Sequence, residues 1–187
     1  MRDFERRGGR LRTLPFPARL VYTIFLAFTL AALALTVWLT EDMVRLDLSE
    51  LGPYYAGTGD PAASDIPPDP EAPLIELPPE LEAPPPAAAM SRRKLLEVTH
   101  FHLFSMPVYL LILSHLYMLS RARAAAKITW IAVGTIGVTA HIAAPWAAAA
   151  SGSSSAWLFA ASGVFLAASF TWMSLVPLWE MWARAPE

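Results

Sequence analysis

Residues 128–150 read ITWIAVGTIGVTAHIAAPWAAAA and contain no Asp, Glu, Lys or Arg. A helix of about 20 apolar residues crosses a bilayer, and lipid offers no water to an unpaired backbone, so this stretch should be a transmembrane helix. Three other windows without charge have the same character: Leu20–Thr40, Val98–Ser120 and Ala156–Trp179. The chain is 55% hydrophobic and 16% charged, whereas soluble domains are about 25% charged. The sequence therefore predicts an all-α membrane protein.

The connections between these windows predict how the helices are arranged. Two loops are short, so consecutive helices should be antiparallel neighbours, and the fold should be an antiparallel four-transmembrane-helix bundle. The predicted boundaries are a basic leader at 1–19, helices at 20–40, 95–120, 128–150 and 156–179, a long loop at 41–94, short connections at 121–127 and 151–155, and a tail at 180–187.

The distribution of Lys and Arg predicts the orientation. Ten of the 14 basic residues lie in the leader, the 121–127 connection and the tail, and four lie in the long loop. Lys and Arg concentrate on the cytoplasmic side of bacterial membranes. We therefore expect a bacterial inner-membrane protein with both termini cytoplasmic and the long loop periplasmic. The apolar run at 20–40 is too long for a signal peptide and predicts a retained helix.

The long loop has an unusual composition. Residues 41–90 hold 11 of the 17 prolines and 11 acidic residues against one arginine. Proline favours the extended polyproline II conformation, and so few apolar residues cannot form a core. The composition predicts a solvated linker. The alternative is an extended strap that lies on a partner protein, docked through Leu74–Leu77.

Four histidines fall within the predicted helices, where ionisable side chains are costly and mark functional sites. On a helical wheel, one face of 95–120 carries Glu97, His100, Ser114, His115 and Met118, while His102 points the other way. The face of His141 on the next helix carries the small residues Gly134, Gly137, Ala144 and Ala148. Small residues suit either a flat cofactor or tight helix packing.

Depth limits which histidines can meet. At 1.5 Å per residue, His141 should lie roughly 13 Å below the outer end of its helix, His100 roughly 6 Å and His102 roughly 9 Å. His115 should lie roughly 28 Å down, near the inner surface. His141 can therefore meet His100 or His102. We prefer His100, because its face is the more polar, and keep His102 as the alternate.

Two cofactors fit such a meeting. One is a single b-type haem with His100 and His141 as axial ligands and Arg92, Arg93 and Lys94 beside its propionates. The other is a metal ion held by Glu97, His100 and His141. The third possibility is that no cofactor binds and the histidines are structural. The absence of cysteine excludes c-type haem and cysteine-ligated iron–sulfur clusters.

A family resemblance adds to this reading. Residues 95–107 read LLEVTHFHLFSMP, followed by LSHL at 113–116 and LVPLWEMW at 175–182. These motifs resemble a family of small, uncharacterised bacterial inner-membrane proteins whose members sometimes carry an elongation-factor label. The resemblance implies four helices and a long external loop, and it implies no activity.

The functional expectation follows from the histidines and from what is missing. The sequence contains no nucleophile–base pair, phosphate loop or soluble catalytic domain, so no catalytic residue is assigned and an independent enzyme is not expected. Without a basic patch interleaved with aromatics, nucleic acid is not an expected partner. The sequence predicts an accessory subunit of a respiratory or electron-transfer complex, in contact with the lipid bilayer and with other membrane subunits. The alternative is a cofactor-free structural subunit that stabilises a partner complex.

Overall fold

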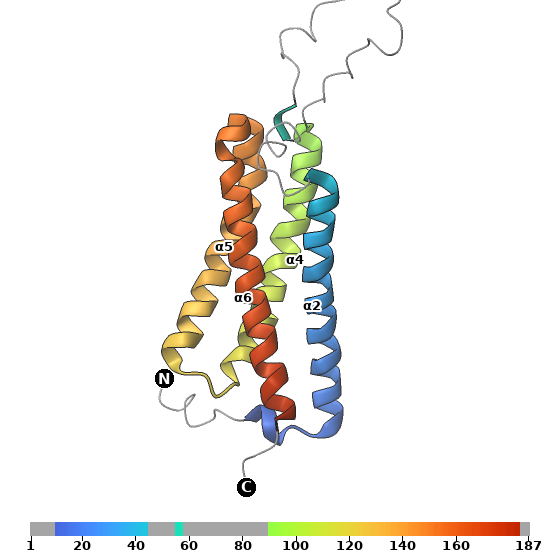
Figure 1. Cartoon of the computed structure of the whole chain (residues 1–187), viewed down its shortest axis with the longest axis vertical. Coiled ribbons are helices and arrows are strands. Elements are labelled where there is room, and N and C mark those ends of the chain that lie inside the picture. Colours follow the sequence, from blue (N-terminus) through green and yellow to red (C-terminus); the bar gives the residue numbers. More distant parts are fainter. Residues whose placement is uncertain (1–9, 45–54, 58–89, 184–187) are drawn as a thin grey trace, which may run out of the picture.

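The computed structural model describes residues 10–44, 55–57 and 90–183. Within these ranges four long helices form a bundle: α2 (Phe16–Val44), α4 (Arg92–Met118), α5 (Ala124–Ser151) and α6 (Ala156–Trp182) (Figure 1). All four are long and apolar enough to cross a membrane. Within the described residues, the prediction of an all-helical protein with four helices long and apolar enough to cross a membrane is confirmed. Two short 3-10 helices, η1 (Arg10–Thr13) and η2 (Gly152–Ser155), lie near opposite ends of the bundle.

The helices extend beyond the charge-free windows. Helix α4 begins at Arg92, three residues before the predicted start, because the Ser91 hydroxyl accepts the Lys94 N–H at 3.2 Å and caps the helix. Helix α2 begins at Phe16, since Pro17 is tolerated in a first turn. Predictions for the outer residues of the leader, most of the long loop, the Leu74–Leu77 patch and the tail lie outside the described residues.

Helix α6 is the element around which the others pack. It contacts α5, α4 and α2, and its contact with α5 is the most extensive of the bundle. A Cβ on Gly137 of α5 would lie 3.1 Å from the backbone nitrogen of Leu166 on α6. Small residues therefore bring these two helix backbones together, as is usual for helices in lipid.

The end of the bundle that carries η1, called here the η1 end, is closed by polar side chains. The Arg19 guanidinium donates to the carbonyls of Leu14 at 2.8 Å, Arg12 at 2.7 Å and Met181 at 3.4 Å. The Trp182 indole donates to Thr23 at 2.9 Å. The start of α2 is thereby fixed to the last turn of α6.

Glu180 organises the connection between α4 and α5 at the same end. The residue is 9% exposed, and both carboxylate oxygens accept the Arg121 backbone N–H at 2.9 Å. The Lys127 ammonium donates to the carbonyls of Met118 and Ser120, both at 2.8 Å. These bonds satisfy backbone groups that a helix terminus otherwise leaves unpaired.

Candidate histidine site

Two histidines meet between α4 and α5, toward the end of the bundle that carries η2, called here the η2 end. The ring of His102 on α4 lies 6.0 Å, centroid to centroid, from the ring of His141 on α5, with an interplanar angle of 69°. Both side chains are half-buried. The structure thus pairs His141 with the residue that the sequence analysis kept as its alternate, and not with the preferred His100.

Hydrogen bonds determine which nitrogen of each ring carries the proton. His102 Nδ1 lies 2.8 Å from the Val98 carbonyl, which can only accept, so this nitrogen carries hydrogen. The Ser162 hydroxyl donates to the Phe159 carbonyl at 2.8 Å and therefore accepts from His141 Nδ1 at 3.1 Å. When such a ring is neutral, its Nε2 is left with a lone pair. Metal-bound histidines are usually oriented by such a bond from the other ring nitrogen.

Aromatic and hydroxyl side chains enclose the pair. The Phe159 ring of α6 lies 4.9 Å from that of His141. About one turn nearer the η2 end, the Trp146 indole of α5 donates to the Thr99 hydroxyl of α4 at 2.7 Å. Tyr55 lies against Phe159, with ring centroids 5.8 Å apart. These contacts hold α4, α5 and α6 together around the two imidazoles.

Sequence reasoning did not identify Ser162, Phe159, Thr99 or Trp146 as part of the site. Depth was the available signal for Ser162, because six residues into α6 correspond to roughly 9 Å, close to the level of His141. The Trp146–Thr99 bond depends on the rotation of both helices about their axes, which spacing alone does not give.

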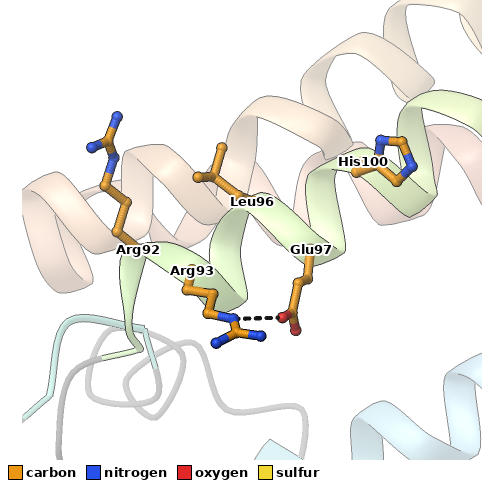
Figure 2. Close-up of a pocket in the computed structure, with 5 residues that line it drawn as sticks. All are labelled: Arg92, Arg93, Leu96, Glu97 and His100. Atoms are coloured by element: carbon orange, nitrogen blue, oxygen red, sulfur yellow. Dashed lines mark hydrogen bonds and ion pairs between the residues drawn. The ribbon is translucent and has the colours of Figure 1, made fainter.

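His100 and Glu97 lie on a different face of α4 from His102. His100 is exposed and lines an open groove of about 540 Å³ with Arg92, Arg93, Leu96 and Glu97 (Figure 2). Glu97 pairs with Arg93 at 3.2 Å and with Lys94 at 3.8 Å, so these cations are not gathered above the histidine pair. This polar face was predicted to meet α5. Ser114 of the face is buried, but Glu97, His100 and His115 are exposed, and the apolar residues Leu95 and Leu113 on the His102 side of α4 are buried.

The predicted metal set of Glu97, His100 and His141 is therefore not assembled. Among the described residues, no group of three or more His, Asp or Glu side chains is placed to hold a metal ion. His115 was predicted to lie too deep to join His141. It is exposed on α4, and the ring that His141 contacts is that of His102.

The small residues on the face of His141 serve helix packing. A Cβ on Gly134 would lie 2.9 Å from Leu110 Cδ1 and 3.2 Å from Ser169 Oγ, while Ala144 and Ala148 are fully buried. Of the two interpretations given to this face, a cofactor wall or close helix contact, the structure matches close helix contact.

These features define the class of protein: an integral membrane helical bundle with a histidine pair between two of its membrane-spanning helices. A family described as a transmembrane helical domain matches residues 85–187, more than half of the chain, and the protein belongs to this family. The match covers α4, α5 and α6, and so includes both histidines of the pair. No curated protein and no solved structure gave a significant match.

Proposed function

We propose that this protein is an accessory subunit of a bacterial electron-transfer membrane complex and that His102 and His141 bind one metal ion. The observation that carries the proposal is the 6.0 Å separation of the two ring centroids. When two imidazoles bind one ion at about 2.0–2.1 Å each, their centroids lie roughly 5–6 Å apart. The orientation of both rings through Nδ1 supports the same role, because it leaves Nε2 available as the ligand atom.

The enclosure of the pair favours a single ion over haem. A porphyrin between these imidazoles would have to enter the interface between α4 and α5. The 2.7 Å bond from Trp146 to Thr99 crosses that interface, and the ring of Phe159 lies 4.9 Å from that of His141. A b-type haem with its propionates near Arg92, Arg93 and Lys94 would require this interface to open. A bare ion requires only the two nitrogens and small ligands.

Copper is the ion that we expect. Imidazole nitrogens suit copper, zinc, iron and nickel, and copper binds such sites most tightly. Zinc has no redox chemistry, so of copper and zinc only copper would serve electron transfer.

The incompleteness of the site supports an accessory role. Two protein ligands leave coordination positions open, and the described residues supply no third His, Asp or Glu to the pair. Water or a side chain of another subunit would complete the coordination. We propose an antiparallel bundle with both termini in the cytoplasm and the acidic, Pro-rich loop in the periplasm. The site would then lie toward the periplasmic surface, within reach of a partner subunit.

One set of contacts favours the alternative, a cofactor-free structural subunit. His141 already bonds to Ser162 and packs on Phe159, as a purely structural histidine would. The two functions make different forecasts for removal of the ring. A structural histidine contributes about 0.6 kcal/mol of interhelical hydrogen bonding on average, and its loss removes no bound metal.

The test is metal analysis and spectroscopy of the full chain in lipid nanodiscs. The protein is loaded with Cu(II), desalted and assayed by elemental analysis and electron paramagnetic resonance. We expect one copper per chain with nitrogen hyperfine structure, lost in His102→Ala and in His141→Ala. The matched control is His100→Ala, on the same helix but exposed, which should retain copper.

Two results would overturn the single-ion proposal. A Soret band with sharp α-bands in the protein as isolated, lost with the same two variants, would establish haem. A protein that binds neither copper nor haem, and in which His141→Ala changes only stability, would establish the structural subunit.

A further inference from the structure

Helix α4 carries a continuous seam of residues that none of the other helices in the described part of the chain covers. Six exposed residues recur at alternating intervals of four and three: Arg93, Glu97, His100, Phe104, Pro107 and Leu111. Phe104 is 77% and Leu111 68% exposed, and only 6% of the apolar window of α4 is buried within the described structure, against 33% for α6. Alternating intervals of four and three are the spacing at which one helix packs along another.

The chemistry of this seam is wrong for lipid. At 1.5 Å per residue, His100 lies about 7.5 Å from the midpoint of α4, inside a hydrocarbon core with a half-thickness of about 15 Å. Ionisable residues at this depth almost always face protein or a water-filled cavity. Glu97 lies one turn nearer the membrane surface on the same seam. A face that places these two groups at membrane depth is expected to be covered by protein.

The exposed half of α2 provides the contrast. Its outward residues Leu35, Val37, Trp38 and Leu39 are 54–73% exposed, and none of them is ionisable. Such a surface suits lipid chains. Exposure alone therefore does not distinguish the seam of α4, whereas its ionisable residues do.

The charges on the seam indicate what covers it. Arg93 and Glu97 stand one turn apart on the same face and pair within the chain at 3.2 Å. Figure 2 shows their side chains together on one side of the α4 ribbon. Around a twofold axis along the membrane normal, a second copy presents the same residues at the same depth. Arg93 of each copy then faces Arg93 of the other and lies one turn, about 6 Å along the helix axis, from Glu97 of the other copy, with which it forms a cross-chain ion pair.

We infer that α4 packs in parallel against α4 of a second copy, and that the protein is a homodimer through this seam. Phe104, Pro107 and Leu111 form the apolar centre of the interface, and each meets its own counterpart. His100 of the two copies face one another, screened from lipid. The open groove beside Arg92 and Leu96 becomes the outer margin of the contact. The inference does not depend on whether His102 and His141 bind a metal, because those rings lie on a different side of α4.

Disulfide formation tests the geometry directly, since the chain contains no cysteine of its own. Single variants Phe104→Cys and Leu111→Cys are oxidised in native membranes, with Leu103→Cys and Ile112→Cys as matched controls. Each control neighbours its test position in sequence and depth but lies about 100° round the helix, and both are exposed, Leu103 58% and Ile112 38%. We expect rapid cross-linking to a homodimer only at positions 104 and 111. Equal cross-linking at all four positions, or cross-linking only to a different protein, would overturn the inference.

A charge exchange separates the interface from a role within one chain. Arg93→Glu or Glu97→Arg alone places like charges along both seams and should abolish cross-linking through Phe104→Cys. When the two single variants are co-expressed with different tags, each supplies the charge that the other lacks, and the mixed dimer should form at least tenfold more than either homodimer. An effect confined to one chain gives no such rescue. Absence of the mixed dimer, with all proteins folded by circular dichroism, would refute the twofold arrangement.

Discussion

Three glycines offer a measurement of how closely α5 and α6 pack. Gly137→Ala and Gly163→Ala both replace a helix-interior glycine, and each should gain up to about 1 kcal/mol of helix propensity. A Cβ at Gly137 would lie 3.1 Å from the Leu166 backbone nitrogen and 3.3 Å from the Phe165 carbonyl carbon, whereas at Gly163 it would meet nothing within 4 Å. Backbone atoms of a packed helix cannot move aside, and overpacking costs about 1–3 kcal/mol.

The difference between the two variants isolates this packing cost, because the propensity gain cancels. We expect Gly163→Ala to be neutral or stabilising and Gly137→Ala to be less stable than it by about 1–3 kcal/mol. Gly134→Ala should fall between them, since its nearest atoms are the side-chain ends Leu110 Cδ1 and Ser169 Oγ. Reversible unfolding by SDS in mixed micelles, followed by circular dichroism, gives the free energies. Equal stability of Gly137→Ala and Gly163→Ala would refute the close approach of α5 to α6.

Three further predictions concern the polar contacts. Ser162→Ala removes the acceptor that orients His141, and should weaken copper binding about 10–100-fold without removing a ligand, as measured by competition with a copper chelator. Glu180→Ala leaves the Arg121 N–H without its carboxylate acceptor, and should lower the unfolding free energy by about 1.5–3 kcal/mol in the same SDS titration; no change would contradict its role in the α4–α5 connection. Thr99→Val removes the acceptor of the Trp146 indole and should lower the unfolding free energy by about 0.6 kcal/mol. A loss of copper binding in this variant would show that the bond also positions His102.

The sequence was sufficient to predict the four long apolar helices, because charge-free windows follow directly from the cost of placing charge in lipid. The ends of the helices were less accessible. Ser91 starts α4 three residues early by accepting the Lys94 N–H, and Pro17 is accommodated in the first turn of α2. Both effects act locally, in stretches at the membrane surface that also carry charged residues. Helix limits taken from charge-free windows therefore begin later than the helices themselves.

The histidine pairing shows a different limit. Helical spacing correctly separated His100 from His102 and matched both in depth to His141, but it does not fix the rotation of α4 about its axis. The preference for His100 requires that the more polar face of α4 turns inward. The structure instead buries Leu95, Leu113 and Tyr117 and forms the Trp146–Thr99 bond, which brings His102 to His141. An inward polar face is a sound assumption only for a helix whose other sides meet lipid, and α4 does not satisfy that condition if a second chain covers its seam.

The two proposals can be joined in a single distance. In a dimer through α4, each His102 lies on the side of its helix away from the seam. Two paired helices have axes about 8–10 Å apart, and each site lies about 5–6 Å beyond its own axis, so the two copper ions should be roughly 20 Å apart. Dipolar electron paramagnetic resonance of the Cu(II)-loaded dimer measures this separation. Arg93→Glu should abolish the dipolar signal and leave the copper content unchanged, whereas His141→Ala should remove the copper and leave cross-linking through Phe104→Cys unchanged. A dipolar distance well above 30 Å with copper fully bound would place the interface on another helix, because no α4 seam separates the two sites by so much.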